Sequence, residues 1–242
     1  MELLSEIKES SVCPSTKPPE KPMDCSEVLF NGHNISGVYT LWPMSRVLTS
    51  ESVKAYCDMD TEGGGWTVIQ RRGNFSRPVD YFYKTWEEYK RGFGLLSEDF
   101  WIGNDVIHAF SNQKLYSVRF DLTDYNGTKA HAVYNKFWID DEDHSYRLHI
   151  SGYHGNAGDS MLVHDNQKFS TKDKKNDNSK TTHCAVYNKG AWWYNNCHQV
   201  NLNGLYVKST FNYTGIIWRG FREFKTLEST EIKIRPYNFL KQ

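Results

Sequence analysis

Five cysteines constrain the fold of this chain more than any other feature of its sequence. None of them forms a C-x-x-C pair, which argues against a zinc ribbon. The last two lie 13 residues apart, so a bridge between them would close a small loop and add about 3 kcal/mol in the chain-entropy model. The second and third could pair likewise, and the first would then be an interchain link or a free thiol. The five are Cys13, Cys25, Cys57, Cys184 and Cys197.

Four N-x-S/T sequons, together with cysteines that can pair, favour the secretory route and predict an extracellular glycoprotein. The sequons start at Asn34, Asn74, Asn126 and Asn212. No apolar run approaches the length of a membrane span. The first residues also lack the apolar core of a signal peptide, and a mature or truncated form of the chain would reconcile that with the cysteines.

Charge and motifs exclude several function classes. Lys and Arg together number 29, as do Asp and Glu, so no basic field exists to attract nucleic acid. The chain has no GxSxG elbow, P-loop, HExxH motif or dinucleotide fingerprint. His183 beside Cys184 would be a nucleophile pair only if that thiol were free. The sequence therefore predicts a binding protein and not an enzyme.

Turn residues and aromatics are unevenly distributed along the chain. Residues 1–22 are rich in proline, which is typical of a flexible tail. From Cys25 the chain becomes dense in aromatics, and we expect residues 23–238 to form one domain. Residues 151–178 are dominated by Gly, Asn, Asp, Ser and Lys, and so long an irregular stretch within a domain is usually functional.

Local patterns predict a mixture of short helices and strands. Thr85 and Glu88 have the spacing of a capping box before a helix over residues 86–91, and a second helix is expected after Asn104, over residues 105–110. Asn126-Gly127 is a hairpin signal. Alternating apolar residues predict strands over residues 116–122, 134–139 and 146–150 and around Ile232 and Ile234. These elements indicate an α+β fold.

Three segments resemble the fibrinogen C-terminal family. They are residues 56–72 (YCDMDTEGGGWTVIQRR), residues 155–160 (GNAGDS), and residues 184–206 with the motifs GAWWYNNCH and NLNGLY. The ending IKIRP at residues 232–236 also fits, so the resemblance covers roughly residues 24–238. Within the family the chain is most similar to invertebrate tachylectin- and ficolin-like lectins.

This resemblance implies an overall architecture. It consists of an N-terminal disulfide-closed unit, a central twisted antiparallel sheet with short helices, and a loop-rich C-terminal recognition subdomain. The resemblance also implies the pairings Cys25–Cys57 and Cys184–Cys197, which agree with the spacing argument above.

In the lectin members an acetyl-group pocket lies beside the second disulfide, and the peptide bond before its second cysteine is cis. The resemblance therefore implies a cis bond between Asn196 and Cys197, both of which are expected at the pocket, and a pocket histidine at His198. Several lectin members carry a tyrosine where this chain has Asn188, a departure that leaves the ligand preference open. The other residues expected at the pocket are Tyr187, Tyr213 and Phe224, for each of which core packing is the alternative.

The resemblance also implies a calcium loop, for which this sequence fits only in part. Asp173 matches the first ligand of the family's Asp-x-Asp-x-Asp pattern, but Lys175 stands where the second carboxylate belongs. A shifted register could bring Asn176 or Asp177 into place, and backbone carbonyls near Asp177 and Ser179 could contribute. Calcium is thus left open as a cofactor.

Two functions follow as expectations. The first is a secreted, lectin-like binder of acetylated sugars, N-acetylhexosamines, on microbial or cell surfaces, which acts in innate immune recognition. The second is a protein-binding relative whose partner is a surface glycoprotein, with an adhesion or receptor-binding role and no sugar. Cys13 would link copies into a homo-oligomer, in which several weak sites gain avidity.

Overall fold

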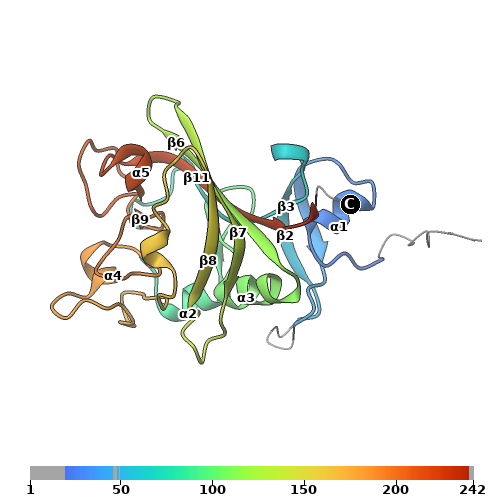
Figure 1. Ribbon diagram of the computed structural model, residues 1–242, viewed down its shortest axis with the longest axis horizontal. Helices are drawn as coiled ribbons and strands as arrows, with labels where there is room; N and C mark the ends of the chain where they lie inside the picture. The colour runs from blue at the N-terminus through green and yellow to red at the C-terminus, as the bar shows by residue number, and fades with distance from the viewer. Residues whose placement is uncertain (1–19, 46–47, 49, 240–242) are drawn as a thin grey trace, which may run out of the picture.

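Antiparallel strand pairing organises the molecule. The computed structural model describes residues 20–45, 48 and 50–239, in which nine strands form one sheet with the central order β1-β2-β3-β11-β6-β7-β8 (Figure 1). Two short strands extend it, because β5 pairs with β3 and β4 pairs with β5. The strands are β1 (Gly37–Leu41), β2 (Val53–Asp58), β3 (Trp66–Arg72), β4 (Phe93–Gly94), β5 (Phe100–Trp101), β6 (Tyr116–Asp124), β7 (Lys129–Ile139), β8 (Leu148–Gly155) and β11 (Leu227–Pro236).

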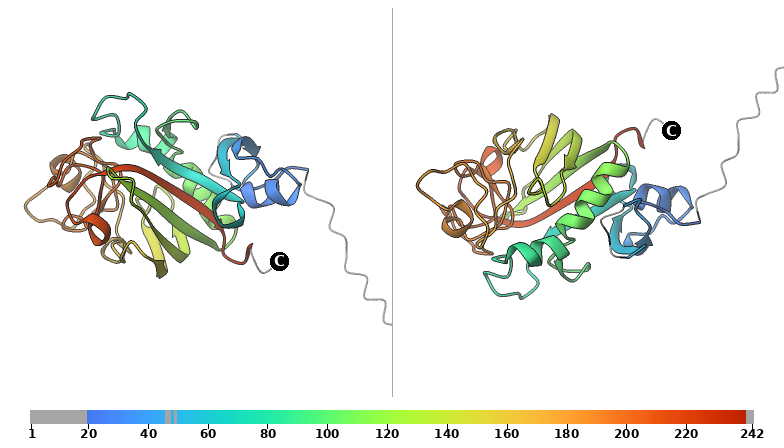
Figure 2. Two further views of the ribbon diagram at one scale, coloured as in Figure 1. Left: turned by 90° about the horizontal axis from the view of Figure 1, so that it is seen from above. Right: turned by 90° about the horizontal axis from the view of Figure 1, so that it is seen from below.

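Short helices complete an α+β fold, as the sequence predicts. Figure 2 shows α3 crossing in front of the sheet from below and lying behind it from above, so this helix covers one face. A second, two-stranded sheet joins β9 (Val200–Asn201) to β10 (Ile217–Trp218). The helices are α1 (Cys25–Phe30), α2 (Trp86–Arg91), α3 (Asn104–Gln113), α4 (Cys184–Tyr187) and α5 (Arg219–Arg222), with 3-10 turns η1 (Thr61–Gly63) and η2 (Leu162–His164).

The helix α2 has the predicted bounds. The Thr85 side chain accepts a hydrogen bond from the Glu88 N–H, and the Glu88 carboxylate accepts one from the Thr85 N–H at 2.8 Å. These bonds satisfy backbone donors that a helix start leaves unpaired, and Gly92 ends the helix with a φ of 91°. The capping-box prediction is confirmed.

The helix α3 is longer than predicted and begins one residue earlier. Gly103 is its N-cap, and Asn104 lies inside the helix, where its side chain accepts a hydrogen bond from the Trp101 indole at 3.0 Å. The expectation that Asn104 precedes the helix is therefore wrong, because a hydrogen bond with Trp101, three residues earlier, uses the side chain that would otherwise cap. The helix continues to Gln113, with Phe110 fully buried.

Two strand predictions also need correction. The strand β7 begins at Lys129, directly after the Asn126-Gly127 turn, and not at Tyr134. Tyr146 lies in the turn before β8 with a φ of 47°, whereas residues 151–155 continue β8 in register with β7. The ends of these strands are set by pairing with a neighbouring strand. Local hydrophobic alternation carries no information about that pairing.

The two disulfides lie at opposite ends of the molecule. Cys25–Cys57 ties α1 to β2 at one end, and Cys184–Cys197 closes the loop region around α4 at the other (Figure 1). Both pairings implied by the resemblance are present. Residues 1–19, and with them Cys13 and most of the expected tail, lie outside the described residues. Near the tail's end, the Pro22 carbonyl accepts a hydrogen bond from the Trp42 N–H at 2.8 Å.

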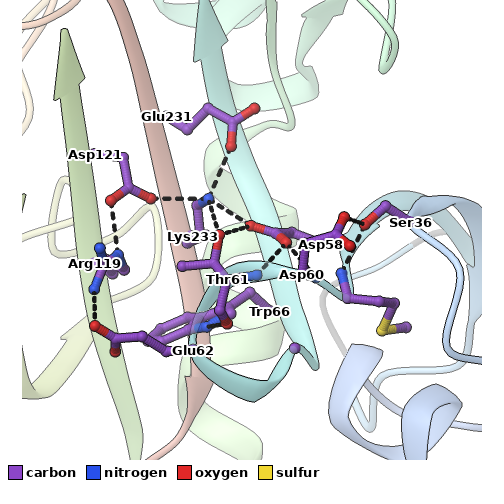
Figure 3. A network of polar contacts seen from close by, with 12 residues as sticks. Ser36, Asp58, Asp60, Thr61, Glu62, Trp66, Arg119, Asp121, Glu231 and Lys233 are labelled. Atoms are coloured by element: carbon purple, nitrogen blue, oxygen red, sulfur yellow. Dashed lines mark hydrogen bonds and ion pairs between the residues drawn. The ribbon is translucent and has the colours of Figure 1, made fainter. Parts of the chain in front are cut away.

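A buried lysine contacts carboxylates from three strands of the sheet (Figure 3). The Lys233 side chain is 3 % exposed, and its ammonium contacts Asp58 at 2.6 Å and Asp121 and Glu231 at 2.9 Å each. Asp121 lies directly opposite Glu231, and Arg119 directly opposite Lys233, between β6 and β11. The diagonal contact of Lys233 with Asp121 offsets the repulsion that like charges opposite each other would produce.

Candidate functional site

A pocket of about 220 Å³ opens beside the Cys184–Cys197 disulfide. Its residues come from α4 and its C-cap, from the segment at the second cysteine of the disulfide, from the loop before β10 and from the segment after α5. The peptide bond between Asn196 and Cys197 is cis, as the resemblance implies. The pocket is lined by Tyr187, Asn188, Cys197, His198, Tyr213 and Phe224. Six of the seven expected pocket residues thus converge, although up to 37 positions separate them (224 − 187 = 37).

The imidazole of His198 is fixed by two acceptors. Its Nε2 lies 3.1 Å from the Asn188 side-chain oxygen and 3.1 Å from the Tyr213 carbonyl. Both partners accept, so Nε2 carries the proton and donates, and Nδ1 carries the lone pair. This Nδ1 atom is buried and has no hydrogen-bond partner among the described residues. His198 therefore forms a rigid, neutral part of the pocket wall.

Asn188 is a buried support for His198. Its amide nitrogen donates to the Cys184 carbonyl at 2.9 Å, which orients its oxygen toward the imidazole. Its own carbonyl accepts from the Asn201 side chain, which also donates to the Gly215 carbonyl, each at 3.1 Å. Sequence reasoning missed Asn201, because the N-L-N-G motif marked the family without assigning this residue a role.

Aromatic rings form the open side of the pocket. The Tyr213 and Phe224 ring centroids lie 4.4 Å apart, and Phe211 packs edge-on against Tyr213 at 5.0 Å. Tyr187 is 62 % exposed and Tyr213 is 41 % exposed, so neither is a core residue. Phe211 is 63 % exposed and extends the aromatic surface beyond the predicted residues.

Backbone donors lie at the disulfide side of the pocket. Within the described part of the chain, neither the Cys197 nor the His198 N–H donates a hydrogen bond. Unpaired N–H groups are rare in partly buried backbone, and these two belong to residues that line the pocket. Asn196, which was also expected here, is exposed and does not line it.

Burial sets the charge of two histidines, one in the pocket wall and one that contacts the chain just after it. Burial lowers the pKa of His198 to about 4, although its hydrogen bond with the Tyr213 carbonyl opposes this. Burial likewise lowers the pKa of His164 to about 3; its Nδ1 donates to the Trp193 carbonyl at 2.8 Å. The His164 Nε2 accepts from the Gln199 and Val200 N–H groups, which fixes the chain just after the pocket.

We expect both imidazoles to stay neutral at pH 5.5 in the folded protein. Unfolded histidines titrate near 6.5, so these two add stability that is fully present above about pH 6.5. It is lost as the pH falls toward 4 and then 3, because the unfolded chain binds the protons first. Two-dimensional NMR of the imidazole nitrogens between pH 8 and 4 measures this. A midpoint near 6.5 for His198 in the folded protein would contradict it.

Of the residues expected to bind calcium, Asp177 and Ser179 lie together, whereas Asp173 has other partners. The Asp173 carboxylate accepts from the Trp86 N–H at 2.9 Å and the Thr171 hydroxyl at 2.7 Å. Asp177 and the Ser179 carbonyl instead contact the Lys175 ammonium. Among the residues that the structure describes, no three His, Cys, Asp or Glu side chains form a group that could hold a metal ion. The arrangement does not fit a calcium ion, which takes six to eight oxygen ligands.

The remaining predicted sites lie on the surface or are closed. Asn34, Asn74 and Asn126 are exposed, and Asn212 is half-buried beside the pocket residue Tyr213. Cys184 is disulfide-bonded, so His183 has no thiol partner there. Over the described residues, no helix combines the length and the apolar character needed to cross a membrane.

The fold and this pocket together define a class of protein: a domain built on an antiparallel sheet, with a pocket in a disulfide-closed loop region at one end. The sequence profile of the fibrinogen beta and gamma chains, C-terminal globular domain, matches residues 21–237. The chain therefore belongs to this fibrinogen C-terminal family, as its motifs predict.

Named relatives agree with this assignment. Techylectin-5A of Tachypleus tridentatus is 48 % identical over 238 residues, 97 % of this chain and 79 % of that protein. A techylectin-like protein of Phoneutria nigriventer is 45 % identical, over 97 % of this chain and 91 % of that protein. Tenascin-R of Homo sapiens is 43 % identical over 90 % of this chain but only 16 % of its own length. The predicted similarity to tachylectins is confirmed.

Solved structures share the fold. The fibrinogen-like globe domain of human ANGPTL2 superposes with a TM-score of 0.83 at 36 % identity, covering 89 % of this chain and 99 % of that one. A lamprey fibrin D-dimer, complexed with the peptide ligand Gly-His-Arg-Pro-amide, superposes with a TM-score of 0.80 at 32 % identity. It covers 90 % of this chain and 74 % of that one.

Proposed function

We propose that this protein is a secreted, lectin-like recognition protein whose pocket binds the N-acetyl group of acetylated sugars on microbial or cell surfaces. The observation that carries the proposal is that one small pocket combines two unused backbone donors, the Cys197 and His198 N–H groups, with aromatic walls. A volume of about 220 Å³ is below the usual range of whole-ligand sites, so it suits one chemical group.

An acetamido group has the matching chemistry. Its carbonyl oxygen would accept from the N–H groups at Cys197 and His198, and its methyl group would pack against Tyr213 and Phe224. Because His198 is neutral, a neutral sugar can bind beside it without the cost of removing water from a charged group. The names of the techylectin relatives support a lectin role, and the two disulfides support secretion into an oxidising compartment.

One such pocket would bind weakly, so clustering would supply the strength. Innate recognition of microbial surfaces is a setting in which repeated acetylated sugars would be bound with higher avidity by several linked sites. Cys13 is the candidate interchain link, and it lies outside the described residues. The homo-oligomer stays a prediction.

His198→Ala is expected to weaken retention on immobilised N-acetylglucosamine by about tenfold or more, which corresponds to about 1.4 kcal/mol. The variant removes the wall that Asn188 and the Tyr213 carbonyl hold in place. Retention is measured by affinity chromatography, with elution by free N-acetylglucosamine or acetate but not by glucosamine, which lacks the acetyl group.

His154→Ala is the matched control, since His154 is exposed on β8 and does not line the pocket. It should be retained like the unmodified protein. If the folded, unmodified protein is not retained at all, the acetyl-binding proposal is wrong and the protein-binding alternative takes its place. If His198→Ala keeps full retention, the sugar is bound elsewhere.

A further inference from the structure

A lysine ammonium occupies the centre of an oxygen cluster beside the pocket. The Lys175 Nζ donates to the Ser179 carbonyl at 2.7 Å and to the Asp177 carboxylate at 2.8 Å, with the Asp177 carbonyl at 3.3 Å. The Asp177 side chain is fully buried, and that of Lys175 is 39 % exposed. A buried carboxylate requires a charged or hydrogen-bonding partner, and Lys175 supplies the charge.

These oxygens are the ones that the family resemblance suggested for a calcium ion. In this chain a metal would meet an ammonium group in the same place, and Asp173 is engaged with Trp86 and Thr171 instead. Two like charges cannot share one small cluster of oxygens without strong repulsion. The cluster therefore already holds its cation, covalently attached to the chain.

The same carboxylate reaches the pocket through the backbone. Asp177 accepts from the Ser179 N–H at 3.0 Å and from the Cys184 N–H at 3.1 Å. Cys184 begins α4, which provides Tyr187 and leads to Asn188, and it bonds to Cys197. The charge of Lys175 thus stabilises the carboxylate that positions one wall of the pocket.

We propose that Lys175 is a built-in substitute for a divalent metal in this loop, so that the folded loop and the adjacent pocket do not need calcium. The proposal goes beyond the sugar-binding function, because loop stability can be measured with no sugar present. Failure of one proposal is therefore distinguishable from failure of the other.

The first test compares calcium and EDTA on the unmodified protein. Differential scanning calorimetry should give the same melting temperature in millimolar CaCl₂ and in EDTA, and isothermal titration with CaCl₂ should show no stoichiometric binding. A melting temperature raised by calcium, or a one-to-one binding isotherm, would overturn the proposal.

The second test changes the charge. Lys175→Met should lower the melting temperature by roughly 5 °C, because it leaves the buried Asp177 carboxylate without its counter-charge. Adding Asp177→Asn should recover part of that loss, which a purely steric role of the lysine stem would not produce. Lys180→Met is the control, since Lys180 is exposed in the same loop and its ammonium forms no ion pair with Asp177 and no hydrogen bond with the Ser179 carbonyl. Equal, small shifts in the Lys175 and Lys180 variants would refute the role of the ammonium.

The third test converts the cluster. Lys175→Asp places a second carboxylate near Asp177 and the Ser179 carbonyl, so calcium should now raise the melting temperature in a concentration-dependent way, as any ligand of the folded state does. Magnesium should act less, since it requires a stricter octahedral geometry. A folded Lys175→Asp protein that ignores millimolar calcium would contradict the idea that the ammonium stands at a cation position.

Discussion

Removal of the Cys184–Cys197 disulfide, as the double variant Cys184→Ser/Cys197→Ser, is expected to abolish retention on immobilised N-acetylglucosamine and to lower the free energy of unfolding by about 3 kcal/mol. The stability loss follows from the loop of 13 residues that the bridge closes. Binding is lost because the bridge connects the start of α4 to the segment that carries His198. Urea unfolding and affinity retention measure the two effects.

The other disulfide provides a matched control. Cys25→Ser/Cys57→Ser opens a longer loop, with a sequence separation of 32, and should cost about 4 kcal/mol in the same chain-entropy model. Because this bridge lies at the opposite end of the molecule, the folded fraction of the variant should bind as before (Figure 1). Equal binding in both double variants would show that the pocket does not depend on its adjacent bridge.

Lys233→Met is expected to lower the free energy of unfolding by about 3 kcal/mol or more, since removing one partner of a buried ion pair leaves uncompensated charge. Asp58 loses the ammonium with which it pairs, whereas Asp121 and Glu231 also lose that contact but keep Arg119 and Arg71 (Figure 3). Asp58 also accepts from the Asp60 and Thr61 N–H groups, so the turn after β2 should loosen as well. Chemical denaturation measures the change.

The dependence on pH identifies the charge interaction. Burial would raise the pKa of Asp58, but Lys233 and Thr61 together lower it well below 3.8. The stability that the charged Asp58 contributes is therefore present above pH 3.8 and is lost as the pH falls further. Burial would lower the pKa of Lys233, but the three carboxylates raise it above 10.5. The stability that the charged Lys233 contributes is therefore present below pH 10.5 and is lost as the pH rises above the raised pKa. The difference in the free energy of unfolding between the unmodified protein and Lys233→Met should therefore be largest between about pH 4 and 10.

An exposed ion pair serves as the comparison. Arg91 contacts Glu87 at 2.5 Å, but their side chains are 76 % and 53 % exposed. Arg91→Gln should change stability by less than about 1 kcal/mol, because water screens such pairs. A Lys233→Met protein as stable as Arg91→Gln would mean that the buried network contributes little.

Local sequence was informative wherever chemistry and spacing act over a few residues. The Thr85–Glu88 box predicted α2 with its observed ends, because capping hydrogen bonds form within one turn. The pocket residues around the disulfide were predicted through family motifs that include Trp192, Trp193 and the N-L-N-G segment. The supporting roles of Asn188, Asn201 and His164 were not, since each acts through partners 10 or more positions away.

The sequence by itself determined the family, the two disulfides, the capped helix and the residues of the pocket. Only the tertiary structure decided that the last strand, β11, lies in the middle of the sheet between β3 and β6, because strand order depends on pairing across the whole chain. It also decided the pairing of Lys175 with Asp177, for which the sequence showed only a lysine where a carboxylate was expected. In each case the deciding interactions, hydrogen bonds between distant strands and contacts with a buried charge, exist only once the chain has folded.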